Sequence, residues 1–135
     1  MTGAGQPERY APSAAEIEAL AHDAMNRLPD AFRAYLSGIL LIVDDFAEEA
    51  ILREMGIEDP FDLTGLYWGR PIGELAQTGD MPATIHLYRR PLLDEWVETG
   101  VSLEALIAHV LIHEVGHHFG LSDAQMHAIE DAAEQ

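Results

Sequence analysis

The chain has no cysteine, which excludes disulfide bonds, thiolate zinc sites and cysteine nucleophiles. Basic residues are also scarce, because seven lysines and arginines stand against 24 aspartates and glutamates, a formal net charge of −17. Such a charge repels phosphate backbones and anionic lipids, so neither nucleic acid nor a membrane is an expected partner. The apolar runs are too short to span a bilayer, and the N-terminus has no apolar segment behind basic residues that would indicate a secretory signal. We therefore expect an acidic, cytoplasmic protein.

Length and composition are those of one globular domain. With 135 residues, of which 48% are apolar and 23% charged, the chain can bury one core without covalent cross-links. Residues 1–12 contain two glycines, two prolines and few apolar side chains, which predicts a flexible N-terminal tail. The domain itself is expected to occupy residues 13–135.

The spacing of apolar residues predicts several helices. A capping box formed by Ser13 and Glu16 opens the first helix, and Pro29 ends it. A second capping box, Ser122 with Gln125, opens a last helix that runs to the C-terminus. Between them the pattern indicates a short acidic helix over residues 46–55, a helical turn or two over 92–98, and a long apolar helix from Ser102 to about Phe119.

Three short strands are expected beside these helices. Residues 39–43 form a continuous apolar run, which favours a strand covered on both faces, and residues 66–68 form a second strand. Residues 84–88 alternate polar and apolar between prolines 82 and 91, which favours an edge strand with one face in water. The fold class is therefore predicted to be α+β, a small mixed sheet packed against helices.

The long apolar helix carries the pattern His-Glu-x-x-His, as His113, Glu114 and His117. At about 100° per residue the two imidazoles lie one turn apart on one face, where both can bind a metal ion at about 2.0–2.1 Å. Glu114 is rotated away from that ion and can take a proton from a water on the metal. Burying three such groups without a metal would be costly, so a purely structural polar cluster is the less favoured interpretation.

A catalytic zinc ion usually has three protein ligands and one water. His109 lies on the same helix face as His113. However, His109 and His117 are eight residues apart, about 12 Å along the axis, so all three histidines cannot share one tetrahedral ion.

The third ligand is therefore expected after the motif. Gly120 allows the chain to turn sharply, so Asp123 can return to the metal. His127 and Glu130 share a helix face with Asp123 and stay open as alternatives, as does His86 from the strand region.

The extended stretch His113-Glu-Val-Gly-His117-His-Phe-Gly120-Leu-Ser-Asp123 resembles two groups of zincins. One comprises short secreted snapalysin-like endopeptidases, and the other comprises minimal zincin-like proteins from bacteria, which residues 66–71 and 84–88 also resemble. The resemblance implies a minimal zincin-like domain with the HExxH helix in its core. It also implies that His113, His117 and Asp123 bind Zn²⁺ and that Glu114 is the general base. Unlike metzincins, the chain has Asp123 in place of a third histidine, and Met126 lies too close to the motif to form a Met-turn.

The same resemblance implies a zinc-dependent metallopeptidase, expected to be an endopeptidase that acts on peptide or protein substrates. We expect the substrate to add as a strand to residues 84–88, where Ile85, His86 and Tyr88 would contact it. His86 or Tyr88 would then support the oxyanion. The alternative hypothesis is a zincin-fold protein that binds metal or a protein partner but cleaves peptide bonds weakly or not at all.

Overall fold

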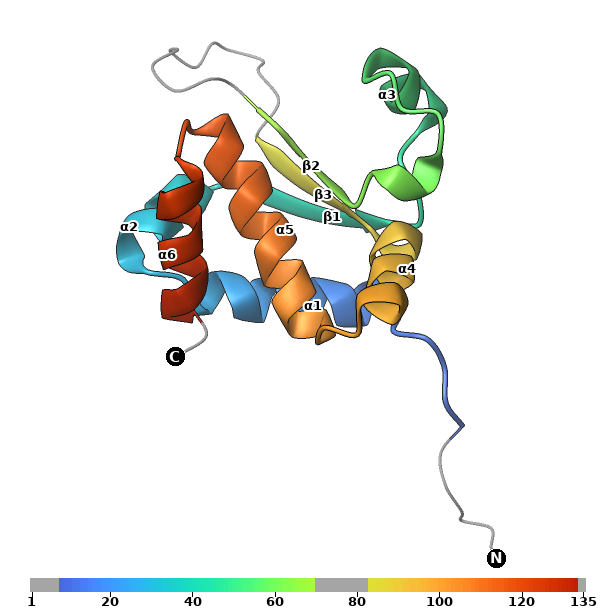
Figure 1. Cartoon of the computed structure of the whole chain (residues 1–135), viewed down its shortest axis with the longest axis horizontal. Coiled ribbons are helices and arrows are strands. Elements are labelled where there is room, and N and C mark those ends of the chain that lie inside the picture. The colour runs from blue at the N-terminus through green and yellow to red at the C-terminus, as the bar shows by residue number, and fades with distance from the viewer. Residues whose placement is uncertain (1–7, 70–82, 134–135) are drawn as a thin grey trace, which may run out of the picture.

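The structure is a computed structural model that describes residues 8–69 and 83–133 (Figure 1). Residues 1–7 of the predicted tail, residues 70–71, Pro82 and the two C-terminal residues lie outside that range. The helices are α1 (Ala14–Arg27), α2 (Asp30–Arg33), α3 (Glu49–Glu54), α4 (Arg89–Thr99), α5 (Leu103–His118) and α6 (Asp123–Ala133). Short 3₁₀ turns occupy Ala34–Leu36 and Pro60–Asp62, and the strands are β1 (Leu40–Asp44), β2 (Gly65–Trp68) and β3 (Thr84–Tyr88).

The three strands form one mixed sheet in the order β1-β3-β2. Strand β3 runs parallel to β1, with Leu41 opposite Ile85, and antiparallel to β2, with Tyr67 opposite Ile85. On one face of this sheet α1 packs against β1, and α5 packs against both α1 and β2 (Figure 1). The predicted α+β fold with a small mixed sheet packed against helices is confirmed.

The prediction that residues 84–88 form an edge strand is wrong, because β3 is the central strand. Its alternation arises because Ile85 and Leu87, both fully buried, face the helices, while the other side chains point to the opposite face of the sheet. The face expected to lie in water is mostly covered as well, because Thr84 and Tyr88 are buried and His86 is half-buried. The alternation of side chains therefore does not report the number of neighbouring strands. Pro91, which suggested an edge, lies in the first turn of α4, where a missing N–H costs little.

The first strand is also placed differently from the prediction. We expected residues 39–43 to be covered on both faces, but β1 is an edge strand. Its side chains alternate between half-buried and exposed, and Leu40 and Ile42 are 51% and 38% exposed. A continuous apolar run was therefore no sign of two covered faces.

Most helix boundaries follow the predictions. The Ser13–Glu16 capping box opens α1, and Ser122 and Gln125 make the reciprocal bonds of a capping box before α6. Helix α3 is shorter than expected and ends before Gly56, which has a φ of +70°. Helix α2 was not predicted; Pro29 both ends the α1 segment and forms the N-cap of α2.

The core gathers around α5, as expected for the HExxH helix. The buried residues of α5 are Leu103, Leu106, Ile107, Val110, Leu111, Ile112, Val115 and Gly116. Strand β2 approaches the helix closely at Gly65, where an added Cβ would lie 2.6 Å from Val110 Cγ1. Glycine is therefore required there for β2 to lie directly on α5. Among the described helices, none is both long and apolar enough to cross a membrane.

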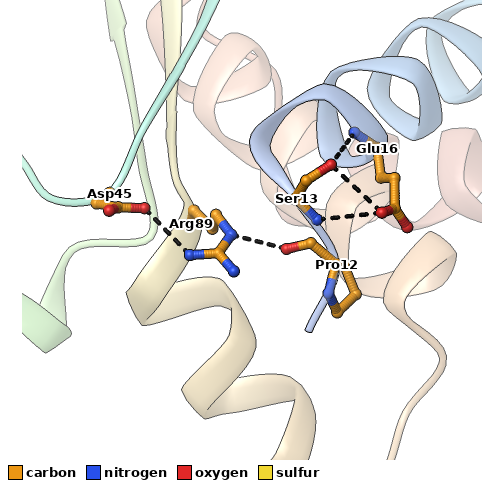
Figure 2. Close-up of polar contacts among 5 residues, drawn as sticks. All are labelled: Pro12, Ser13, Glu16, Asp45 and Arg89. Atoms are coloured by element: carbon orange, nitrogen blue, oxygen red, sulfur yellow. Dashed lines mark hydrogen bonds and ion pairs between the residues drawn. The ribbon is translucent and has the colours of Figure 1, made fainter. Parts of the chain in front are cut away.

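Arg89 joins three separate parts of the chain (Figure 2). Its Nε donates to the carbonyl oxygen of Pro12 at 2.7 Å, and its Nη1 lies 3.3 Å from Asp45 Oδ1 (Figure 2). Pro12 directly precedes the capping box of α1, and Asp45 follows β1. The guanidinium thus ties the start of α1 to the sheet. The division into a tail over 1–12 and a domain over 13–135 stays a prediction.

Candidate metal centre

Helix α5 presents the His-Glu-x-x-His residues near its C-terminal end. Ser102 caps the helix by accepting a hydrogen bond from the Ala105 N–H at 3.1 Å, which satisfies one of its free donors. The helix ends where Gly120 takes a φ of +75° and the Leu121 N–H bonds back to the Gly116 carbonyl at 2.8 Å. This turn, predicted from Gly120, sends α6 back along α5, and Figure 1 shows the two helices side by side.

The contact between these helices centres on Gly116 and Met126. Met126 is fully buried, and an added Cβ on Gly116 would lie 2.5 Å from its sulfur. Gly116 is the second of the two variable residues in the motif, so the helix can carry the motif and still receive α6 closely. Met126 lies within α6 and packs against α5, which confirms that it forms no separate turn.

The side chain of Glu114 extends from α5 toward the edge strand β2. Its Oε2 accepts a hydrogen bond from the Tyr67 backbone N–H at 3.4 Å. Burial raises the pKa of the Glu114 carboxyl above its usual value, while the Tyr67 N–H and the charge of His117 act in the opposite direction. A half-buried carboxylate with a raised pKa is a better proton acceptor than an exposed one, which suits a general base.

His113 is surrounded by other imidazoles. Its ring centroid lies 4.1 Å from that of His109, 6.0 Å from that of His117 and 6.1 Å from that of His127. Its Nε2 also lies 2.5 Å from Glu130 Oε1 on α6. His113 therefore connects the predicted motif to two side chains of α6.

Within the described residues, one group of three metal-binding side chains has all its ligand atoms within 4.8 Å of one another: His109, His113 and Glu130. His117 and Asp123 are exposed and lie outside this group. The sequence had set His109 aside because it cannot share an ion with His117. The structure pairs His109 with His113 and Glu130 instead, an arrangement that the four-residue spacing of the histidines permits.

The side chains of β3 do not offer a substrate-binding edge. Ile85 faces the helices and Tyr88 is 1% exposed, so neither is open to a peptide. The His86 ring stacks with Tyr88 at 6.1 Å, and its Nδ1 lies 4.0 Å from Asp44 Oδ2. Because β3 has a neighbour on each side, the prediction that a substrate adds to this strand is wrong.

The donor atoms at this end of α5 suit zinc. Imidazole nitrogens and carboxylate oxygens are the ligands that Zn²⁺ takes in the absence of cysteine. His113, His117, His127, Asp123 and Glu130 supply both kinds, from two helices in contact. The donor types are therefore those that zinc takes, and among the described residues His109, His113 and Glu130 are close enough together to hold a metal ion.

The family model described as zincin-like metallopeptidase matches residues 36–133. No curated protein matches the chain. The matched region covers all three described strands, the HExxH helix α5 and the returning helix α6. The features that define the candidate site therefore lie within the family match, and the chain belongs to the zincin-like metallopeptidase family.

Proposed function

We propose that the protein is a zinc-dependent endopeptidase in which Glu114 is the general base and His113 and His117 hold the metal. The observation that carries the proposal is the position of Glu114, half-buried on α5 and hydrogen-bonded to the backbone of the edge strand β2. A structural glutamate would gain little from that position, whereas a base must sit beside the bound peptide. The cytoplasmic location expected from the sequence belongs to the same proposal.

The catalytic chemistry follows from these positions. Bound zinc would polarise the scissile carbonyl and lower the pKa of a water molecule. Glu114 would accept a proton from the attacking water through the carboxylate oxygen that Tyr67 does not hold, and would pass it to the leaving amine. The raised pKa of Glu114 helps the first transfer, because the protonated carboxyl is favoured in its buried setting.

We place the substrate along β2 in place of β3. Within residues 8–69 and 83–133, strand β2 pairs only with β3, and it lies against α5. An extended peptide that adds to the side of β2 away from β3 would bind mainly through backbone hydrogen bonds. Trp68, 57% exposed at the end of β2, offers a flat apolar surface for a substrate side chain. This arrangement favours cleavage within extended, unfolded segments over cleavage of folded proteins.

The third zinc ligand is proposed to be Asp123, on the resemblance of the extended motif. Asp123 is the first residue of α6, directly after the turn at Gly120. His127 and Glu130, further along the same helix, are the competing assignments. Glu130 has the closest contact with the motif, through His113.

The test measures cleavage of end-blocked, unstructured peptides by wild type and Glu114→Gln, with the products identified by mass spectrometry. End-blocked peptides report internal cleavage alone. We expect Glu114→Gln to lower kcat/KM by about 10²–10⁴-fold, the usual contribution of a general base. Glu104→Gln is the matched control, because Glu104 is exposed in the first turn of the same helix. It should leave the rate unchanged.

Zinc content is measured on the same preparations. Glu114→Gln should retain zinc, whereas Asp123→Asn should weaken zinc binding if Asp123 is the third ligand. No cleavage by the zinc-loaded wild type, or equal cleavage by Glu114→Gln, would contradict the peptidase proposal. Undiminished zinc affinity together with undiminished kcat/KM in Asp123→Asn would remove Asp123 from the ligand set and leave the role of Glu114 standing.

A further inference from the structure

We propose that His109, His113 and Glu130 form a second metal-binding site, one helical turn before the His113–His117 pair, and that the two sites compete for His113. The binding itself goes beyond the proposed peptidase and would hold without it. Its effect on catalysis rests on the proposed function.

The geometry of the three side chains is close to that of a zinc site. Glu130 Oε1 lies 2.5 Å from His113 Nε2 and 2.9 Å from His109 Nδ1, and all ligand atoms lie within 4.8 Å of one another. Around a tetrahedral ion with bonds of about 2.0–2.1 Å, neighbouring ligand atoms are roughly 3.3–3.4 Å apart. Each of these two contacts would have to lengthen by less than 1 Å to reach that spacing. A metal ion could then bind at the point where one carboxylate oxygen now bridges the two imidazoles.

Rigid elements hold these side chains. His109 and His113 are one turn apart on α5, with ring centroids 4.1 Å apart. Glu130 comes from α6, one turn after Met126, which packs directly against Gly116 of α5. The two helices thus fix the spacing of the ligands before any metal binds, which lowers the ordering cost of binding.

Metal and water can reach the site from solvent. The His109 side chain is 50% exposed, and those of His113 and Glu130 are 21% and 20% exposed. Both His109 and Glu130 line a pocket of about 400 Å³ and a neighbouring one of about 300 Å³. Arg27 and Glu104 line the first pocket and Glu95 the second, so negative charge prevails around the opening. The net charge of −17 adds a further attraction for cations.

The two sites cannot both be filled, because each requires His113. The His113 Nε2 atom that contacts Glu130 can bind one ion at a time. An ion held by His109 and Glu130 would lie beside the helical turn that precedes His113. Glu114 and His117 both follow His113 along the helix. Such an ion would be out of place for a water activated by Glu114. The second site therefore provides a resting position that holds metal without catalysis.

The experiment titrates Zn²⁺ by calorimetry into metal-free protein, with native mass spectrometry to count bound ions. The His117→Ala variant removes the motif site and should keep one site per chain. In that background, His109→Ala or Glu130→Gln should weaken zinc binding by about tenfold or more. His22→Ala and Asp131→Asn are the controls and should change nothing, since both residues are exposed and lie outside the group.

The outcomes separate this site from the peptidase proposal. Unchanged zinc affinity when His109 or Glu130 is altered in His117→Ala would overturn the second site, as would loss of all zinc in His117→Ala alone. Two tightly bound zinc ions per wild-type chain would overturn the competition. If the titrations give the expected result but no peptide is cleaved, the second metal site is supported and only the peptidase proposal is contradicted. His109 is exposed, so His109→Ala should fold, which circular dichroism of the metal-free variants verifies.

Discussion

Replacing Gly116 with alanine would place a methyl group where α6 rests on α5. The new Cβ would lie 2.5 Å from the Met126 sulfur and 2.8 Å from its Cγ. Since Met126 is fully buried, its side chain has little room to move away. Overpacking of this kind costs about 1–3 kcal/mol, whereas alanine gains about 1 kcal/mol over glycine inside a helix. We expect Gly116→Ala to lower the free energy of unfolding by about 0–2 kcal/mol.

A double-mutant cycle with Met126→Ala isolates the contact. Truncating Met126 alone should cost about 2–5 kcal/mol through the cavity it leaves. In that background the methyl group at position 116 meets open space, so the same substitution should stabilise the protein. The expected coupling is about 1–3 kcal/mol, measured by urea denaturation of the four metal-free proteins.

Zinc affinity provides a second measurement on the same four proteins. Gly116→Ala should displace α6, which carries both Asp123 and Glu130. Zinc binding should therefore weaken in this variant, no matter which of the two residues is the ligand. The double variant should recover part of the lost affinity. Additive stability changes, within about 0.5 kcal/mol, would refute the view that this contact sets the spacing of the two helices.

Two further predictions concern residues outside the metal ligands. Ser102→Ala should cost about 1 kcal/mol in urea denaturation, because it removes the hydroxyl that accepts from the Ala105 N–H at the start of α5; an unchanged midpoint would show that this cap contributes nothing. Tyr88→Phe should raise stability at pH 7 by up to about 1 kcal/mol, because the buried hydroxyl has no hydrogen-bond partner among the described residues. Burial also raises the pKa of Tyr88 to about 12, so the wild type should lose stability between pH 10 and 12, where the phenol ionises more readily in the unfolded chain. Tyr88→Phe should lose less over this range, although Tyr67, whose pKa burial also raises, contributes to the loss in both proteins. A destabilised Tyr88→Phe, or an equal alkaline loss, would contradict this.

Features of the fold that depend on neighbouring residues were predictable from the sequence. The capping boxes at Ser13 and Ser122 and the left-handed residue Gly120 were identified from short patterns, because caps depend on a few consecutive residues. The order of the strands was not predictable in this way. Strand β3 is central because β1 and β2, both distant in sequence, pair with its two sides, and the side-chain alternation of β3 carries no sign of that.

In the candidate site, too, the features set by local sequence were predictable and those set by tertiary packing were not. The position of Glu114 between two histidines follows from helical spacing alone, so the sequence was sufficient to propose it. The contact of Glu130 with His109 and His113 depends on how α6 crosses α5. That crossing is governed by the packing of Met126 on Gly116, a tertiary contact with no local signature. The sequence therefore placed Glu130 only among the alternatives.

The hydrogen bond from the Tyr67 N–H to Glu114 couples the position of the proposed base to that of strand β2, so the two form one unit. Tyr67 is also held by its side chain, whose ring lies 4.1 Å from His118 and 5.6 Å from Phe119 at the end of α5. A peptide that pairs with β2 in register would leave this unit undisturbed and meet an aligned carboxylate. One that pushes the strand aside would carry the base away from the reacting carbonyl. An enzyme that works in this way would discriminate between substrates by alignment, and would reject a poor fit through lost turnover more than through weak binding.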